Sequence, residues 1–318
     1  MLLRETLVAV PEGAEEIRLQ LPHLQLAALA WGDPNGKPLL ALHGWLDNAM
    51  SFVKLAPALA AAGYRVVAID FVGHGFSDWR PAGQTYLMLD NCFDVQAAVM
   101  ALGWTQFTLV GHSMGAGVAS LLAGAHPSVV EKLVLIDGLG TLTTPDKDAA
   151  DQLGQALARW IGYQEKTQNK DDKEQVSSFS GRVYSSIEAA AKARMKGVGA
   201  VDYAAALQLC QRALQQNDLA EPDAGWFWRS DSRLRHPSPF RLTETQNLSF
   251  MAAIEAPTLY LEGDKGLMLD RPEIVTRLKT IKNIQKVALA GGHHLHLEEA
   301  SFKAVEEEIV KFLSKLES

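Results

Sequence analysis

A serine flanked by glycines is the part of this sequence best suited to chemistry. Gly111-His112-Ser113-Met114-Gly115 follows the apolar run 107–110 and precedes residues 116–125, whose small side chains are typical of a helix. A strand that turns sharply into a helix strains its serine and exposes the hydroxyl, an arrangement called a nucleophile elbow. Glycine is then required at both ends, because a Cβ there would collide with neighbouring backbone. We predict that Ser113 is a nucleophile; the alternative is a glycine-rich helix start capped by serine.

A serine hydroxyl needs a base to take its proton, and histidine titrates in the right range. Residues Gly291-Gly292-His293-His294-Leu295-His296 lie between the last expected strand and the final helix. We predict His293, which follows the glycine pair, as the base, and expect His294 and His296 to pack or cap the helix. The H-H-x-H spacing would also suit a metal, but no second ligand cluster can be paired with it from the sequence. We therefore expect no metal site.

The base must be held in one tautomer by a carboxylate, and the sequence offers two. Asp137 ends the apolar run 133–136, one helix after the serine, whereas Asp264 follows the run 259–261. Either could instead be a strand-end turn residue. We favour Asp137, because its strand is expected beside the strand of Ser113, and keep Asp264 as the alternative acid.

An oxyanion formed at the serine needs two backbone donors. The N–H of Met114, next to the nucleophile, is one; the loop His43-Gly44-Trp45-Leu46 supplies the other, most simply from Trp45. Aromatic clusters are more often part of a core than of a ligand site. With that alternative open, the residues we expect in the substrate pocket are Trp45, His112, Trp226 and Trp228.

Other polar residues favour structural interpretations. His74 lies in Asp70-Phe71-Val72-Gly73-His74-Gly75-Phe76-Ser77, which follows an expected strand and has the composition of a turn. A local positive surface, solvated or ion-paired, is expected around Arg229, Arg233, Arg235 and Arg241.

The elements that must position these residues alternate along the chain. Two runs with a partly exposed face predict an antiparallel strand pair, at 16–21 and 24–31. Short apolar runs typical of buried parallel strands follow at 38–42, 65–70, 107–111, 132–137, 257–261 and 284–289. Helical stretches separate them at 52–62, 86–102, 114–125, 272–281 and 302–316. This alternation predicts an α/β fold with a doubly wound, mostly parallel sheet.

One interval breaks the alternation. Between residues 138 and 249 we find no convincing strand, while apolar residues recur with helical spacing at 153–161 and 203–214. We interpret the polar stretch 164–174 as a mobile connection. The predicted division is therefore a core of residues 1–140 and 250–318 and a helical cap of residues 141–249. The cap is expected over the carboxyl edge of the strands, where ligands bind in open α/β sheets.

Composition limits the function classes. The chain has 318 residues, 47% of them hydrophobic, and a net charge of −7, which argues against a nucleic-acid partner. The two cysteines, Cys92 and Cys210, imply no disulfide framework. The first residues include the charged pair Arg4-Glu5 at a position where a signal peptide would be apolar. No apolar segment is as long as a membrane-spanning helix requires. We expect a cytoplasmic monomer or homodimer that acts on a small molecule.

Taken in order, these motifs resemble the α/β-hydrolase superfamily over nearly the whole chain. The segment His43-Gly44-Trp45-Leu46-Asp47-Asn48, with Arg233-Leu234 and 237–239, is similar to the serine hydrolase-like branch. The resemblance implies an eight-stranded sheet and ester hydrolysis through Ser113 and His293. Many members carry the acid after the seventh strand as G-x-x-D, but here the third residue after Gly263 is Gly266. Related short-chain esterases place it after the sixth strand, 24 positions past the nucleophile, which is Asp137.

The resemblance also narrows the reaction. Haloalkane dehalogenases and epoxide hydrolases of this fold use an aspartate nucleophile, so Ser113 argues against both. Carboxylesterase, thioesterase, C–C bond hydrolase, cofactor-free haloperoxidase and hydroxynitrile-lyase chemistry stay open. A non-catalytic binding or signalling member would be expected to lack the serine or the histidine. We predict a cofactor-free hydrolase of small to medium apolar carboxylic esters that forms an acyl-enzyme.

Overall fold

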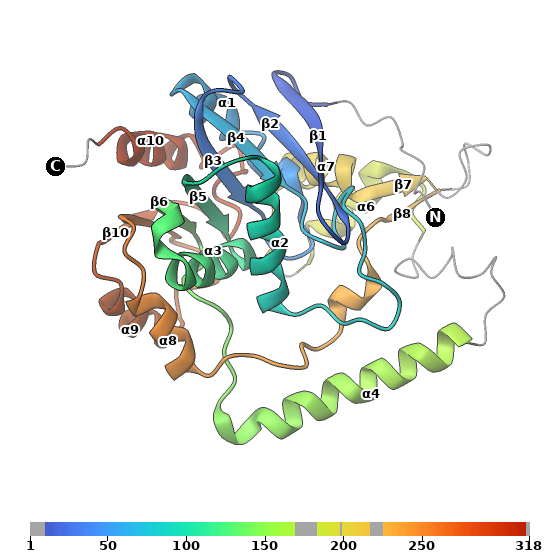
Figure 1. The fold of residues 1–318 in the computed structure, drawn as a ribbon. Helices are drawn as coiled ribbons and strands as arrows, with labels where there is room; N and C mark the ends of the chain where they lie inside the picture. Colours follow the sequence, from blue (N-terminus) through green and yellow to red (C-terminus); the bar gives the residue numbers. More distant parts are fainter. Residues whose placement is uncertain (1–9, 169–182, 198, 217–224, 316–318) are drawn as a thin grey trace.

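An eight-stranded sheet forms the centre of the computed structural model, which describes residues 10–168, 183–197, 199–216 and 225–315 (Figure 1). In spatial order the strands are β1 (Ala14–Gln20), β2 (Gln25–Trp31), β4 (Tyr64–Ile69), β3 (Lys37–Leu42), β5 (Phe107–His112), β6 (Val130–Ile136), β9 (Thr258–Gly263) and β10 (Ile284–Leu289). β2 pairs antiparallel with β1 and β4, and all other neighbours are parallel. The predicted α/β class and mostly parallel sheet are confirmed.

Burial explains why these segments form strands. All six residues of β5 are buried, as expected for a central parallel strand covered on both faces. The edge strand β10 instead has no fully buried residue. Each expected strand of the sheet is present, with ends shifted by at most a few residues.

Helices cover both faces of the sheet and build a core on each. One core includes residues of α2 (Met88–Ala101), α3 (Met114–Ala125), α8 (Glu244–Ala252) and α9 (Glu273–Thr280). The other includes residues of α1 (Ala56–Ala61), α6 (Ile187–Arg194), α7 (Tyr203–Ala213) and α10 (Phe302–Leu313). The sheet is therefore doubly wound.

The helix expected over residues 52–62 is divided in two. A 3-10 turn, η1 (Ala49–Phe52), comes first, and α1 begins only at Ala56. Pro57 lies in the first turn of α1, where its missing N–H is tolerated. Further inside a helix the proline ring would clash with the preceding turn, so a continuous helix through Pro57 is not available.

The segment between β6 and α8 contains the helices α4 (Ala149–Gln168), α6 and α7. It also contains a two-stranded antiparallel sheet, β7 (Leu214–Gln216) and β8 (Trp226–Trp228), which the sequence analysis missed. Each strand has only three residues, too few for a periodic pattern. The expected mobile connection at 164–174 is wrong for residues 164–168, which continue α4; residues 169–174 lie outside the described residues.

The predicted boundary at residues 249 and 250 falls inside α8, which packs closely on α3. A Cβ on Gly124 of α3 would lie 2.2 Å from the Phe250 carbonyl oxygen, so the glycine permits this contact. The division into core and cap stays a prediction.

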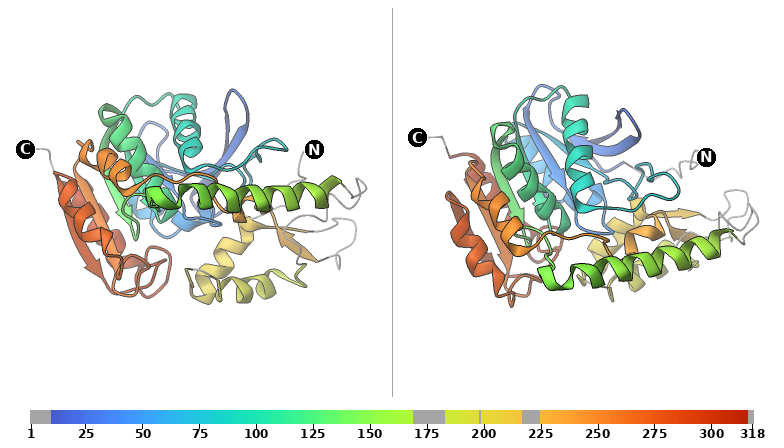
Figure 2. Two further views of the ribbon diagram at one scale, coloured as in Figure 1. Left: turned by 90° about the horizontal axis from the view of Figure 1, so that it is seen from below. Right: turned by 60° about the horizontal axis from the view of Figure 1, so that its bottom comes forward.

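The long helix α4 lies apart from the helices that cover the sheet in Figure 1, and Figure 2 shows it from two further sides. Its residues Leu153, Leu157 and Ile161, which belong to the apolar residues with helical spacing, are 46%, 50% and 51% exposed. The packed face is the adjacent one, where Ala156 is buried and Tyr163 contacts His236 edge-to-face at 5.2 Å. Among the described residues, no helix is both long and apolar enough to cross a bilayer.

Candidate active site

Ser113 occupies a sharp turn between β5 and α3. Its φ and ψ are 52° and −113°, in the region that disfavours side chains. A Cβ on Gly111 would lie 2.5 Å from the carbonyl oxygen of Gly115, and one on Gly115 would lie 2.1 Å from that of Leu42. These contacts confirm the expected steric reason for both glycines. The serine is partly exposed at the carboxyl end of its strand.

His293 lies between Ser113 and Asp137. Its Nε2 is 2.9 Å from Ser113 Oγ, and its Nδ1 is 2.5 Å from Asp137 Oδ2. Since the carboxylate can only accept, Nδ1–H donates to it, and Nε2 is left to accept the serine proton. The Asp137 carboxylate is fully buried and also accepts the N–H of Leu267 at 2.9 Å.

The alternative acid, Asp264, has a different position. It is exposed, and its Oδ1 accepts the backbone N–H of Gly291 at 2.9 Å. Of the two candidates, Asp137 is the one hydrogen-bonded to the imidazole of His293. Asp264 instead ties the loop after β9 to the glycine pair that precedes this histidine.

One expected oxyanion donor lies at the start of α3, and the other lies in the loop after β3. Met114 is the first residue of α3, so its N–H has no partner within the helix. Trp45 follows β3, and the next residue, Leu46, has φ 62°. The N–H of Leu46 donates to Nε2 of His74 at 3.2 Å, while Nδ1–H of His74 donates to the Val72 carbonyl at 3.1 Å. His74 therefore has a structural role, holding the loop that contains Trp45.

Burial keeps the histidines under this loop neutral. It lowers the pKa of His74 to about 3, and it also lowers the pKa of His43. His43 donates from Nδ1 to the Gly44 carbonyl at 2.7 Å and accepts the N–H of Phe71 at Nε2. Both imidazoles thus join the ends of β3 and β4.

The other histidines of the H-H-x-H segment do not converge on one point. His294 Nε2 is 3.0 Å from Asp47 Oδ2, and His296 Nε2 is 2.8 Å from Ser51 Oγ. Arg194 of α6 donates to Asp47 Oδ1 at 2.9 Å. Burial opposes ionisation of Asp47, but its contacts with His294 and Arg194 outweigh that effect and hold its pKa well below the usual range.

One group of side chains has the composition of a metal site. Ligand-type atoms of Asp47, His112 and His294 lie within 4.8 Å of one another. The guanidinium of Arg194 already contacts two of these residues, with Nη2 3.3 Å from Nε2 of His294. Arg194 thus supplies the positive charge that a metal ion would bring to Asp47, so the group is better explained as an ion-pair network.

Ser113, His293, Met114 and Trp45 line one cavity of about 650 Å³. Much of its wall is apolar, with contributions from Met88, Leu89, Leu121, Leu142, Phe240, Leu242 and Met268. Its volume is in the usual range for a small-molecule site.

Three residues expected in the pocket do not line this cavity. His112 is fully buried behind the site, where its Nε2–H donates to the carbonyl of His293 at 2.9 Å. Trp226 and Trp228 belong to β8 and pack against the core that contains α6 and α7. Trp228 packs edge-to-face on Tyr184, with ring centres 5.9 Å apart. Pairing with β7 fixes this orientation, which the sequence pattern did not indicate.

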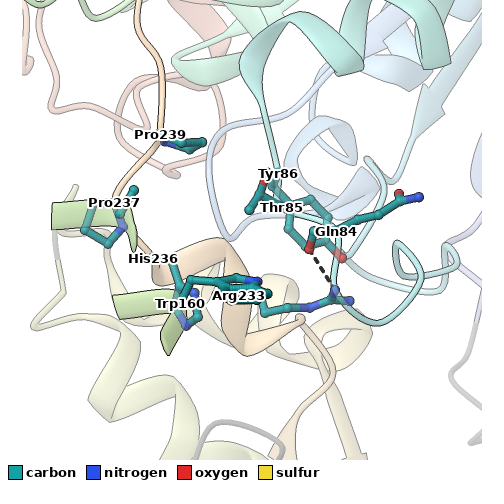
Figure 3. A pocket seen from close by; sticks show the side chains of 9 residues that line it. Gln84, Thr85, Tyr86, Trp160, Arg233, His236, Pro237 and Pro239 are labelled. Carbon is teal, nitrogen blue, oxygen red and sulfur yellow. Dashed lines mark hydrogen bonds between the residues drawn. The ribbon is translucent and has the colours of Figure 1, made fainter. Parts of the chain in front are cut away.

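Sequence reasoning missed the arginines of the cavity wall. Arg194 was not singled out, and Arg233, Arg235 and Arg241 were interpreted as part of a local positive surface and not as cavity residues. Figure 3 shows Arg233 directed toward Gln84, beside His236 and Trp160; its Nη1 donates to the Gln84 carbonyl at 2.9 Å. Such pairings join segments far apart in the chain, and local spacing carries no signal for them.

Comparison with known proteins agrees with this geometry. The family model described as alpha/beta hydrolase fold matches residues 37–300. The chain belongs to the α/β-hydrolase family. Among the α/β-hydrolases, it is 30% identical over 317 residues to a serine hydrolase-like protein of Danio rerio, covering 97% of this chain and 91% of that protein. This places it in the serine hydrolase-like branch.

Solved α/β-hydrolase structures are also similar. A hypothetical protein from Pseudomonas aeruginosa PAO1 is 43% identical, with a TM-score of 0.83 and coverage of 95% of this chain and 100% of that chain. A thioesterase domain from the curacin biosynthetic pathway is 26% identical, with a TM-score of 0.76 and coverage of 95% and 99%. The relation therefore extends over nearly the whole length of both solved chains.

Proposed function

We propose that this α/β-hydrolase cleaves small to medium apolar carboxylic esters through an acyl-enzyme on Ser113. The observation that carries the proposal is the pair of contacts at His293, 2.9 Å to Ser113 Oγ and 2.5 Å to Asp137 Oδ2. A hydroxyl, an imidazole and a buried carboxylate in this order form the arrangement that activates a serine.

The chemistry requires only these side chains and water. Nε2 of His293 takes the serine proton as Oγ attacks the ester carbonyl, and the Asp137 carboxylate stabilises the imidazolium. The N–H groups of Met114 and Trp45 donate to the oxyanion. His293 then gives the proton to the departing alcohol, which leaves the acyl group on Ser113. Water, deprotonated by the same imidazole, attacks the acyl carbon and releases the acid.

Residues 141–249 are the part of the chain we propose as the lid over this site. One observation supports the proposal: residues of this segment, among them Arg194, Gly199 and Arg235, line the cavity that contains Ser113. The cavity of about 650 Å³ and its apolar wall suit an acyl chain of moderate length.

Thioester hydrolysis is the second candidate. One solved relative, 26% identical over 95% of this chain, is a thioesterase domain. A thioester carbonyl is attacked by the same hydroxyl, so the proposed residues would act without change. The difference between the two substrates lies in the leaving group, which the cavity must accommodate.

A fluorophosphonate probe tests the nucleophile directly. It should label Ser113 in the wild-type protein, and Ser113→Ala should lose both labelling and ester turnover. Ser249→Ala, an exposed serine of α8, is the matched control and should keep both. Full turnover of p-nitrophenyl esters by Ser113→Ala would exclude the proposed mechanism. A series of esters and N-acetylcysteamine thioesters of equal acyl length would distinguish the two candidate functions.

A further inference from the structure

The cavity that contains Ser113 is rich in arginine. Its wall includes one carboxylate, Asp47, and six guanidinium groups, those of Arg194, Arg233, Arg235, Arg241, Arg271 and Arg277. The chain as a whole has a net charge of −7. Positive charge is therefore concentrated at the place where the proposed substrate binds.

Four of the six charges are balanced by carboxylates. The pairs are Arg194 with Asp47 at 2.9 Å, Arg233 with Asp231 at 2.6 Å, Arg271 with Glu273 at 3.5 Å and Arg277 with Glu244 at 2.6 Å. Within the part of the chain that the structure describes, no carboxylate lies within ion-pair distance of Arg235 or Arg241. Both residues are exposed at the cavity wall, so their guanidinium groups are open to solvent and to a bound anion.

The backbone that carries Arg235 is firmly held. It belongs to the 3-10 turn η5 (Ser232–Arg235), whose Arg233 donates to the carbonyl oxygen of Pro81 and to that of Gln84, the latter seen in Figure 3. The indole N–H of Trp45 donates to the carbonyl of Leu234 at 3.0 Å. Arg235 is therefore presented from a fixed wall, next to the loop proposed to supply an oxyanion donor.

Arg235 shares the cavity wall with a second guanidinium group, that of Arg194. Burial lowers the pKa of Arg235; Tyr184 opposes this effect, and repulsion by Arg194 adds to it. An anion bound at this point would relieve that repulsion, and guanidinium groups bind carboxylate, sulfate and phosphate through paired N–H donors.

We propose that Arg235, supported by Arg241, binds an anionic group of the substrate. The substrate class is then an ester or thioester with an apolar part and a carboxylate, sulfate or phosphate. The inference rests on the proposed function, because Ser113 defines which part of the cavity is the substrate site. It refines that function, since a purely apolar ester would leave both arginines unused.

Matched substrate pairs test the proposal and locate the anion. For an anion on the acyl side, mono(p-nitrophenyl) adipate is compared with p-nitrophenyl hexanoate. For an anion on the leaving group, hexanoyl-coenzyme A is compared with hexanoyl-N-acetylcysteamine. For at least one of the two pairs, the wild-type kcat/KM for the anionic substrate should exceed that for the neutral substrate by about 10- to 100-fold, the range for hydrogen bonds to a charged group. Arg235→Gln should reduce that ratio toward one, and Arg235→Lys should restore part of it.

Arg159→Gln is the matched control, because Arg159 is exposed on α4 and does not line the cavity. Its ratio should equal that of the wild type. A ratio near one in both pairs for the wild type, or a high ratio unchanged in Arg235→Gln and Arg241→Gln, would overturn the inference while ester hydrolysis stands. Calorimetric binding of the same pairs to Ser113→Ala gives an answer without turnover: equal affinity for both members of each pair would also overturn it.

Discussion

A Cβ on Gly266 would lie 2.0 Å from Oδ1 of Asp137, so the space beside residue 266 is already filled by the carboxylate of residue 137. Position 266 is where the G-x-x-D pattern of many α/β-hydrolases would put the acid. A carboxylate approaching His293 from the loop after β9 and one approaching from the end of β6 would compete for the same volume. The aspartate at 137 therefore requires a residue without a side chain at position 266.

Replacement of either candidate acid tests this assignment. Asp137→Asn should lower kcat by about 10⁴-fold, because the amide cannot stabilise the imidazolium or hold its tautomer. Asp264→Asn keeps an oxygen that can accept the N–H of Gly291, so its kcat should stay close to the wild type. Steady-state kinetics on one activated ester measures both. A larger loss in Asp264→Asn would reverse the assignment.

Crowding at Gly266 gives a second prediction. Gly266→Ala should displace the Asp137 carboxylate from His293 and lower kcat by about 100-fold, since shifts near 1 Å have effects of this size. Gly154→Ala is the matched control, because a Cβ at that position meets nothing within 4 Å. Its kcat should not change. An equally active Gly266→Ala protein would mean that the carboxylate has room to move.

Stability should fall in acid because four buried histidines are held neutral. Burial lowers the pKa of His43, His74, His112 and His296 below 6.5. Below that pH the unfolded chain binds protons that the folded protein does not, so the free energy of unfolding decreases as the pH falls. Each histidine contributes about 1.4 kcal/mol per pH unit until its folded pKa is reached, about 3 for His74.

Urea unfolding between pH 7.5 and pH 4.5 measures this slope. In His74→Gln, the slope of the free energy of unfolding against pH should be smaller by about 1.4 kcal/mol per pH unit, the contribution of one histidine. His126→Gln, at an exposed position, is the control for removing a histidine as such. A free energy of unfolding that is constant over this range would contradict the prediction.

Arg212 of α7 is buried and forms ion pairs with two carboxylates. Its Nε contacts Asp70 Oδ2 at 2.8 Å, and its Nη1 contacts Glu16 Oε2 at 2.6 Å. Arg212→Leu would leave the fully buried Asp70 without its cation and should destabilise the protein by about 3–5 kcal/mol. Lys303→Ala, which removes an exposed pair with Glu306, should change stability by less than about 1 kcal/mol. Chemical denaturation of both variants is the measurement.

Backbone strain at the serine predicts an unequal effect of two similar substitutions. Ser113→Ala and Ser113→Gly both remove the hydroxyl, but only glycine adopts φ 52° without steric penalty. Ser113→Gly should be more stable than Ser113→Ala by about 1 kcal/mol. Thermal unfolding of the pair decides, and equal stability would show that the turn is not strained.

The parts that the sequence predicted well depend on local pattern and on the geometry of parallel sheets. Buried strands are continuous apolar runs, and their carboxyl ends must share one edge, so Ser113, Asp137 and His293 could be assigned to the same site. The ranking of Asp137 over Asp264 used strand adjacency in the same way. The hydrogen bond from His293 to Asp137 agrees with that ranking.

Most of the site features that the sequence did not predict depend on how the segment between β6 and α8 packs. Trp226 and Trp228 turn away from the cavity because a short β7–β8 pair, invisible to periodicity, sets their direction. His112 was misplaced for a different reason: it lies on the buried strand β5, where neighbouring side chains point to opposite faces, so it turns away from the nucleophile. The contact of Arg194 with Asp47 joins residues 147 positions apart, which no local spacing encodes.

The ion pairs of Arg212 limit which segments can be exchanged between α/β-hydrolases of this branch in a chimera. Arg212 comes from α7, in the segment between β6 and α8, Glu16 comes from β1, and Asp70 follows the end of β4. A chimera whose segment between β6 and α8 came from another protein without an arginine at this position would leave the buried Asp70 and the partly exposed Glu16 without their cation. That segment and the N-terminal strands must therefore be transplanted together, although nearly 200 residues of sequence separate Glu16 from Arg212.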